Sequence, residues 1–470
     1  MAEGSMQPLL MIPEICTFLG GLVVLLTGSF VARERQWITR LVAAIALALA
    51  ALSALWALPS PTSVAFEGSF VVDTSTTVAR VLVALGSALI LALASDEIAS
   101  TPRESETYAL MLFASSGALV LAGAQDILVL AAGFLLASIP LYGLIGMSRS
   151  ARSAEAAMKT YLLGALFGIV LLGGVTVLYG VTGVTRYADL AEQLPAAPSA
   201  AVALGTLALL VGLMFKAGGV PAHFWVPDAA QGATVTAATF VTTIPKIGAL
   251  IAAYRFVLVL PDSLAWPLFV AVLATASMTL GNLAAYQQDD PRRLLGWSTV
   301  SQVGYLLVPV AMASRSEFAG PALLAYLCAY TVTNIAAFAV TAAMPHCRSI
   351  GDYRGLARGQ GWLSVSLAVA LLGLLGTPPT AVFVGKLLVV VTAWDAGSAW
   401  LAIVVLMNTL ISLYYYLRWF AQPFRAPVDR ESQSTAAPGV WASATAVCAA
   451  GLSVGVGLGA GLLLTVLGQS

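Results

Sequence analysis

The stretch Met214-Phe-Lys-Ala-Gly-Gly-Val-Pro-Ala-His-Phe-Trp-Val-Pro-Asp228 places a lysine directly before two glycines and a proline, at the end of a long apolar segment. Proline lacks a backbone N–H and its ring clashes with the preceding turn, so a helix that reaches Pro221 is interrupted there. Within a bilayer, a broken helix is tolerated only where its freed backbone groups face protein or water. The stretch therefore predicts an interrupted membrane helix with Lys216 at the break.

The whole chain has the composition of an integral membrane protein. Its 470 residues are 59% hydrophobic and 9% charged, and its mean hydropathy is +0.91, whereas a soluble chain carries roughly 25% charged residues. A soluble globular enzyme, a disordered chain, a collagen and a disulfide scaffold are excluded. Basic and acidic residues number 22 each, so no basic surface is available for nucleic acid.

The sequence lacks the usual signatures of a cofactor site. The four cysteines form no CxxC pair, and the two histidines, His223 and His346, do not join them at metal-ligand spacing. No glycine-rich phosphate loop of the P-loop or dinucleotide-binding type follows a strand. We therefore expect no cofactor or metal in this chain.

Fourteen apolar segments are long enough to span a membrane, for which about 20 residues suffice. They follow one another with no room for a soluble domain, so the predicted fold is an all-α polytopic membrane protein. The predicted spans are 9–30, 37–58, 74–95, 107–124, 127–147, 157–179, 199–219, 234–260, 264–286, 297–313, 319–343, 362–392, 399–422 and 438–465.

The loop charges predict the orientation. Fourteen spans put both termini on one side, and the positive-inside rule places them outside, on the periplasmic side of a cell (inner) membrane. The outer loops then carry only Arg186 and Arg315 as basic residues. The cytoplasmic loops carry Arg33, Arg35, Arg103, Arg149, Arg152, Lys159, Arg292, Arg293, Arg348, Arg354, Arg358, Arg425 and Arg430.

The lysines lie where a membrane protein normally avoids them. Only four of the 22 basic residues are lysines, and three of them, Lys216, Lys246 and Lys386, fall within predicted spans. A lysine at the bilayer centre costs about 2.5–3.5 kcal/mol on insertion scales. Desolvation disfavours the charged form of a buried lysine, so it can exchange a proton, while arginine stays protonated. Three such lysines predict a proton relay; the structural alternative is that each lysine pairs with a backbone carbonyl or a carboxylate and only fixes packing.

A second break repeats the first. Lys386 follows Thr377-Pro-Pro-Thr380, so Pro378 and Pro379 interrupt the twelfth span as Pro221 interrupts the seventh. Paired interrupted helices in corresponding halves indicate a transport pathway. Spans four to eight and nine to thirteen form two sets of five, inverted because five is odd, with a lysine on the fourth member of each. The predicted divisions are 1–106 (three-helix segment), 107–260 and 264–422 (five-helix repeats, one half-channel each) and 437–470 (C-terminal helix).

Five motifs together resemble a known family. Met214–Ala233 is similar to the signature of the antiporter-like subunits of respiratory complex I, which are related to Mrp-type sodium/proton antiporters and membrane hydrogenase subunits. The stretch Asp352-Tyr-Arg-Gly-Leu356 resembles subunit N of NADH–quinone oxidoreductase more than subunits L or M. The other matching stretches are Leu10-Met-Ile-Pro-Glu14, Arg292-Arg-Leu-Leu-Gly-Trp-Ser-Thr-Val-Ser-Gln-Val-Gly-Tyr305, and Gly376-Thr-Pro-Pro-Thr380 with Gly385-Lys386.

The resemblance implies a function for the lysines. In that family each half-channel uses a charged residue on a broken helix, which Lys216 and Lys386 match, and Lys246 matches a lysine on the following helix. Electron transfer from NADH to quinone takes place in other subunits. The implied partners are the other membrane-arm subunits, the lipid bilayer and protons.

Two positions depart from the family pattern. The family usually carries a glutamate three residues before a Ser-Leu-Pro-Leu-Tyr-like stretch, but that position is Leu135 here, before Ser138. Lys216 thus lacks its expected partner unless Asp126, Glu155 or Asp228 reaches it. Gln302 stands where relatives often have histidine, and an amide does not titrate.

Several other residues carry weaker hypotheses. His223, two residues after Pro221, is either a proton relay or a histidine bonded to backbone. Glu14 is expected as an interfacial cap, with a subunit contact or an exit-side acid as alternatives. Arg80 and Arg255 are expected to form structural pairs or to contact neighbouring subunits. The aromatic run Tyr414-Tyr-Tyr416 with Trp419 is expected to serve mainly in interfacial belts and in packing.

Three functions remain open at this stage. The favoured one is a complex I antiporter-like subunit that contributes proton translocation and no redox chemistry of its own. The alternatives are a cation/proton antiporter subunit of an Mrp-like or hydrogenase complex, and a structural spacer that moves no ion, which Leu135 and Gln302 favour.

Overall fold

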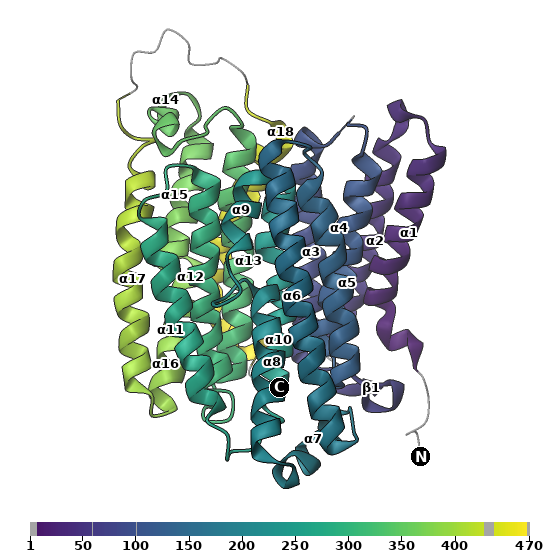
Figure 1. Cartoon of the computed structure of the whole chain (residues 1–470). Coiled ribbons are helices and arrows are strands. Elements are labelled where there is room, and N and C mark those ends of the chain that lie inside the picture. The colour runs from purple at the N-terminus through teal and green to yellow at the C-terminus, as the bar shows by residue number, and fades with distance from the viewer. Residues whose placement is uncertain (1–6, 59, 100, 427–436, 468–470) are drawn as a thin grey trace.

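The computed structural model describes residues 7–58, 60–99, 101–426 and 437–467, and in these residues it is a bundle of long helices with one small hairpin (Figure 1). The α-helices are α1 (Ile12–Phe30), α2 (Trp37–Ala57), α3 (Thr74–Glu97), α4 (Glu104–Gly123), α5 (Ile127–Gly146), α6 (Ala151–Thr182), α7 (Tyr187–Gln193), α8 (Ser199–Ala217), α9 (Trp225–Gly232), α10 (Val235–Val257), α11 (Trp266–Ala285), α12 (Pro291–Ala311), α13 (Ala319–Ala343), α14 (Leu356–Gly359), α15 (Gly361–Leu375), α16 (Ala381–Asp395), α17 (Ala399–Phe420), α18 (Val440–Leu458) and α19 (Ala460–Leu467). Strands β1 (Ser63–Ala65) and β2 (Phe70–Val72) pair antiparallel, and short 3-10 turns are η1 (Pro8–Met11), η2 (Arg33–Arg35), η3 (Phe66–Gly68), η4 (Leu194–Ala196) and η5 (Ile350–Tyr353).

The helices confirm the predicted all-α membrane fold. Thirteen helices in the described residues are long and apolar enough to span a membrane. The predicted span 362–392 is the exception, because it consists of two helices of 15 residues, α15 and α16, neither of which is long enough alone. Counting this pair as one gives the fourteen predicted spans.

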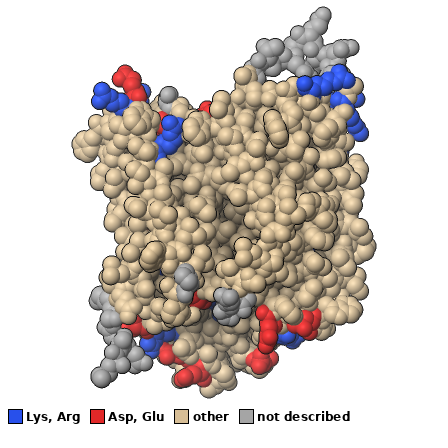
Figure 2. Space-filling model, turned by 180° about the vertical axis from the view of Figure 1, so that it is seen from behind, with Lys and Arg blue, Asp and Glu red and all other residues tan. Residues whose placement is uncertain are grey.

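The charged side chains gather at the two ends of the bundle. On the face shown in Figure 2, an uncharged band separates an upper end with mostly basic residues from a lower end with mostly acidic ones. A band of this kind fits the hydrocarbon core of a bilayer, which is about 30 Å thick. The basic residues of the predicted cytoplasmic loops lie on one end, except that Arg430 is outside the described residues.

Both predicted breaks are present and are built alike. Helix α8 ends at Ala217 and α9 begins at Trp225, while α15 ends at Leu375 and α16 begins at Ala381. Each first half is closed by a glycine in the left-handed region, Gly218 at φ 82° and Gly376 at φ 89°, a conformation that glycine adopts without a Cβ clash. The peptide bonds before Pro221 and Pro379 are cis. The division into two five-helix repeats stays a prediction.

Helices α10, α12 and α13 form the centre of the molecule. Nearly every residue of their apolar windows is buried, whereas α1, α2, α6, α17 and α18 bury less than half of theirs. Lys246 lies on α10, Gln302 on α12, and both breaks pack against these helices. Groups on the central helices are thus shielded from lipid on all sides.

Two buried ion pairs tie the first helices to the bundle. The guanidinium of Arg80 on α3 contacts both carboxylate oxygens of Glu14 on α1 at 2.8 Å, and it also donates to the carbonyl of Leu10. Glu14 is therefore a buried ion-pair partner, not the interfacial cap expected from the sequence. Arg255 on α10 pairs with Asp73, the N-cap of α3, at 2.6 Å. Both arginines have the structural partners predicted for them.

The motif Asp352–Leu356 lies at the basic end of the bundle and connects two segments there. Ser349 and Asp352 form a reciprocal capping box around η5. The backbone N–H groups of Gly355 and Ala357 donate to the carbonyls of Gln422 and Pro423, just after α17. The motif therefore joins the loop that precedes α15 to the end of α17.

Candidate functional site

Lys246 lies in the middle of α10, fully buried, and its partner is a backbone carbonyl. Its Nζ donates to Val241 O at 2.6 Å. That carbonyl lacks its usual helical donor, because the residue four positions later is Pro245, which has no N–H. The amine also lies 4.7 Å from the centre of the Trp225 ring at the start of α9. The proline thus provides the acceptor that holds the lysine after it.

Lys386 is held in a similar way at the second break. Its Nζ donates to Leu375 O, the last residue of α15, at 2.9 Å. The last four carbonyls of a helix have no helical donor, and the helix dipole favours a positive charge at this end. The amine lies 4.3 Å from the centre of the Tyr305 ring. Gly376 makes the close approach possible, since a Cβ there would lie 2.8 Å from Lys386 Cδ.

Lys216 lies on the last turn of α8 and is buried among aromatic rings. Its Nζ is 5.4 Å from the centre of the Phe134 ring on α5. The neighbouring Phe215 packs against Trp225 with the two rings tilted, and the Trp225 indole N–H donates to Phe215 O at 3.1 Å. Because Trp225 also contacts Lys246, one indole links the surroundings of the first two lysines.

None of the three acids considered as partners of Lys216 pairs with it. Asp126 caps α5, Glu155 pairs with Lys159, and Asp228 pairs with Lys159 and Arg293. Within the described part of the chain, Lys159 is the one lysine that forms an ion pair. Among the described residues, Lys246 and Lys386 are therefore held by carbonyls and aromatic rings, and Lys216 by an aromatic ring, without carboxylate partners.

Leu135, which stands where the family has a glutamate, faces away from Lys216. Leu135 is 40% exposed on the outer face of α5, while Phe134 is 1% exposed and faces Lys216. A side chain at position 135 would lie at the protein surface, where lipid or a neighbouring subunit covers it. The aromatic ring of Phe134 is what meets the ammonium in this chain.

Gln302 forms the centre of a hydrogen-bond network between the two breaks. Its amide nitrogen donates to Leu374 O at 2.9 Å and to the Tyr416 hydroxyl at 3.3 Å, and its oxygen accepts from Tyr326 at 2.6 Å. Tyr416 also bonds Ser298 at 2.6 Å. Since Leu374 precedes the residue that binds Lys386, the network ends beside the third lysine.

A second link leads from the network toward Lys246. Tyr330 on α13 donates to Thr242 O at 2.7 Å and lies 3.1 Å from the Thr299 hydroxyl on α12. Thr242 adjoins the residue that binds Lys246, and Thr299 is one helical turn from Gln302. A row of polar groups thus joins Lys246 to Lys386 across α10, α13 and α12. We call these residues the central polar row: Lys246, Thr242, Tyr330, Thr299, Gln302, Tyr416, Tyr326 and Lys386.

His223 lies within the first break and is also buried. Neither ring nitrogen has a hydrogen-bond partner among the described residues, and the same holds for the indole nitrogen of Trp297, whose ring lies 5.6 Å away. The choice between a proton relay and a histidine bonded to backbone stays a prediction. A buried polar atom without a partner costs about 1–3 kcal/mol, so these nitrogens favour a hydrated site.

The role of the tyrosines in the central polar row was not predicted from the sequence. Of the two roles expected for the aromatic run 414–419, packing holds for Tyr415, Tyr416 and Trp419, which are fully buried, while Tyr414 is exposed. The division has a physical reason: α17 presents one face to α11, α15 and α16, and residues 415, 416 and 419 share that face at helical spacing. His346 is exposed in its loop, as expected.

Comparison with known proteins identifies the family. A family model described as NADH:quinone oxidoreductase/Mrp antiporter, TM, matches residues 124–412. NADH-quinone oxidoreductase subunit N of Mycobacterium sp. (strain JLS) is 60% identical over 459 residues, which is 98% of this chain and 98% of that protein. The chain belongs to the subunit N family of NADH-quinone oxidoreductase. This membership confirms the resemblance and makes the chain an antiporter-like membrane subunit of the complex I type.

Solved structures agree on the fold. A chain of respiratory complex I from Thermus thermophilus superposes with a TM-score of 0.84 at 30% identity, covering 97% of this chain and 99% of that one. A chain of the Mrp complex from Dietzia sp. DQ12-45-1b superposes with a TM-score of 0.85 at 23% identity, covering 98% of this chain and 96% of that one. The second likeness shows a common fold alone, so it adds nothing in favour of cation/proton antiport.

Proposed function

We propose that this subunit N family member conducts protons through Lys216, Lys246 and Lys386, with Gln302 and His223 as supporting groups. Proton movement would be coupled to electron transfer from NADH to quinone in other subunits of the complex. Pro221, Pro378 and Pro379 would serve by breaking the helices beside the lysines. The observation that carries the proposal is that Lys246 and Lys386 donate to carbonyls freed by a proline or a helix end.

A carbonyl partner leaves the charge of a lysine free to change. An ammonium has three N–H donors, and a neutral amine still has two, together with a lone pair that accepts a proton. Either form can therefore keep its bond to Val241 O or Leu375 O. A carboxylate partner would instead stabilise the charged form strongly, because opposite charges in contact favour ionisation. The lysine sites are thus suited to gaining and losing protons.

The central polar row supplies a path between these lysines. Tyrosine hydroxyls both donate and accept, and so do water molecules beside them. Gln302 does not titrate, so it would orient hydroxyls and waters without holding the proton. Its bond to Leu374 O keeps this part of the row beside the second break.

The proposal extends to the partners of the chain and to its orientation in the membrane. We infer that the chain assembles with other membrane-arm subunits, as the complex I likeness supports. The redox cofactors would bind those subunits, since this sequence lacks their usual motifs. We place both termini on the periplasmic side, because basic side chains dominate the opposite end of the bundle (Figure 2).

The test compares Lys216→Met and Lys386→Met with wild type in the assembled complex. Removing a group that passes a proton slows that step by about 100-fold or more, so we expect fewer protons translocated per NADH oxidised. The measurement is dye quenching in proteoliposomes against NADH consumption. Lys159→Met is the matched control, since this lysine is exposed and paired with carboxylates.

The structural spacer is the second candidate, because no carboxylate pairs with Lys216 in the described chain and Leu135 points outward. A spacer predicts an unchanged ratio of protons to NADH in both buried-lysine variants, provided that the complex assembles. That result would remove the proton-relay role and leave the family membership intact.

A further inference from the structure

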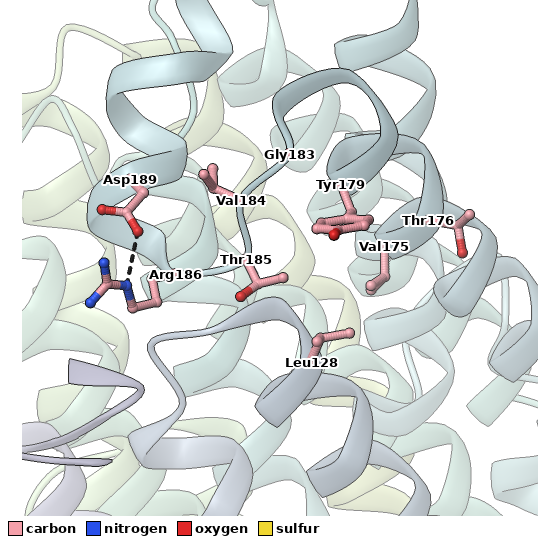
Figure 3. A pocket seen from close by; sticks show the side chains of 9 residues that line it. All are labelled: Leu128, Val175, Thr176, Tyr179, Gly183, Val184, Thr185, Arg186 and Asp189. Atoms are coloured by element: carbon pink, nitrogen blue, oxygen red, sulfur yellow. Dashed lines mark hydrogen bonds and ion pairs between the residues drawn. The ribbon is translucent and has the colours of Figure 1, made fainter. Parts of the chain in front are cut away.

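A pocket of about 570 Å³ lies at the acidic end of the bundle, far from the central polar row in the sequence and in the fold. Figure 3 shows its lining, which comes from the start of α5, the end of α6 and the segment that leads into α7. The pocket is not part of the proton path described above, so it calls for a separate account.

The pocket opens sideways, toward the membrane. Leu128 on α5 and Tyr179 on α6 line it and are each more than half exposed. Val175 continues the apolar wall deeper along α6. Tyrosine is enriched at the membrane–water boundary, where its ring is in lipid and its hydroxyl in water. The position of Tyr179 places the pocket at the level of lipid headgroups.

The other end of the pocket carries one positive and one negative group. Arg186 Nε donates to Asp189 Oδ2 at 2.8 Å, and Arg186 Nη1 donates to Glu67 O at 3.1 Å. Within the described chain no hydrogen bond is found for Arg186 Nη2 or Asp189 Oδ1. Figure 3 shows this pair at the opposite side of the pocket from Tyr179 and Val175. The Arg186 guanidinium is thus fixed in place by Nε and Nη1, while its Nη2 remains available as a hydrogen-bond donor.

We propose that this pocket binds a phosphatidylethanolamine molecule, with the lipid phosphate on Arg186 and the lipid ammonium on Asp189. The free Nη2 of the guanidinium suits a phosphate oxygen, to which it donates a charge-assisted hydrogen bond. The glycerol end of an acyl chain lies along Leu128 and Val175, and Tyr179 covers it from the side.

The charge pair selects among lipid classes. A phosphatidylglycerol headgroup has no cation for Asp189 Oδ1, so its phosphate and the Asp189 carboxylate would share the single positive charge of Arg186. A choline headgroup is cationic but has no N–H, so it cannot donate to Asp189 Oδ1. An ethanolamine headgroup satisfies both side chains at once.

The experiment uses the intact complex in gentle detergent and three photoactivatable lipids that differ only in headgroup. Each carries a diazirine near the glycerol end of one acyl chain, on phosphatidylethanolamine, phosphatidylcholine or phosphatidylglycerol. We expect the ethanolamine probe to label peptides from 175–189 about ten-fold more than the other two, which corresponds to one charge-assisted hydrogen bond.

Two variants and a control test the charge pair separately. Arg186→Gln and Asp189→Asn should each reduce labelling by the ethanolamine probe about ten-fold, and Asp189→Asn should also remove the preference over phosphatidylglycerol. Arg315→Gln is the matched control, an exposed arginine at the same end of the bundle, and should leave labelling unchanged. Copurification of the other subunits verifies folding for each variant.

Three outcomes would overturn the proposal. Equal labelling by all three probes would mean an apolar slot without headgroup recognition. Unchanged labelling in both variants would place the lipid elsewhere. Absence of label from all three probes would rule out a lipid there, and a cross-link from a photoreactive residue at position 176 to a neighbouring subunit would show that protein fills the pocket.

Discussion

Lys246 Nζ binds the carbonyl of Val241 at 2.6 Å, and Pro245 is the residue that leaves this carbonyl without a backbone donor. Pro245 thus frees the carbonyl that the next residue, Lys246, uses as its acceptor. We expect Pro245→Ala to restore an N–H that competes for Val241 O. The helix gains about 1 kcal/mol from the new hydrogen bond, while Lys246 loses its fixed acceptor and proton translocation per NADH falls.

The control for this prediction is Pro140→Ala in α5, another buried proline inside a helix but without a lysine after it. It should gain similar stability without losing proton translocation. The measurements are the thermal dissociation midpoint of the complex and the proton-to-NADH ratio. A Pro245→Ala variant that pumps like wild type would mean that Lys246 does not depend on this carbonyl.

A double-mutant cycle tests whether Gln302 and Tyr416 act together. Gln302→Leu leaves the Tyr326 hydroxyl without its acceptor, and Tyr416→Phe removes only a hydroxyl. Each buried group left unpaired costs about 1–3 kcal/mol. Because the two side chains share one network, we expect an interaction energy of about 0.5–3 kcal/mol. Additive losses, in stability and in proton translocation, would mean that the contact of 3.3 Å between them is incidental.

The fold was predictable because membrane spans depend on local composition. Runs of about 20 apolar residues fix the number of crossings, and prolines at 221, 378 and 379 fix the breaks through local chemistry. The buried lysines were predictable for the same reason, since a charge inside an apolar run is visible in the sequence. Family motifs added the assignment to subunit N.

The partners of the lysines were not predictable, because they depend on contacts between distant segments. Tyr326 and Tyr416 are 90 residues apart on the chain, and both bond to Gln302. From the sequence alone, Tyr416 was equally compatible with an interfacial belt and with packing. One signal was available: Tyr415, Tyr416 and Trp419 share one face of a helix, and such a face can pack inward as well as outward.

Gly376 is expected to be needed for the placement of Lys386 as well as for its own backbone angle. Gly376→Ala forces an L-residue into φ 89° and sets a Cβ 2.8 Å from Lys386 Cδ. Gly397→Ala imposes a comparable φ of 71° with no atom within 4 Å of the new Cβ. Both changes cost about 1–2 kcal/mol for the left-handed backbone, but only the first displaces Lys386. We expect reduced proton translocation in Gly376→Ala alone; equal pumping by the two variants would contradict this.

The buried pair between Glu14 and Arg80 is expected to hold α1 and α3 together. Removing one partner, as in Glu14→Gln or Arg80→Met, leaves a buried charge poorly compensated and costs about 3–5 kcal/mol. Replacing both with apolar residues, Glu14→Leu with Arg80→Met, should recover much of that loss, because an apolar pair of similar volume carries no desolvation penalty. The exposed pair of Glu155 and Lys159 is the comparison, since breaking it should change stability by about 1 kcal/mol or less.

Two measurements report the effect: the protease accessibility of the segment before α1 and the thermal dissociation midpoint of the complex. A double variant less stable than both single variants would show that the ion pair itself, and not charge compensation, fixes these helices.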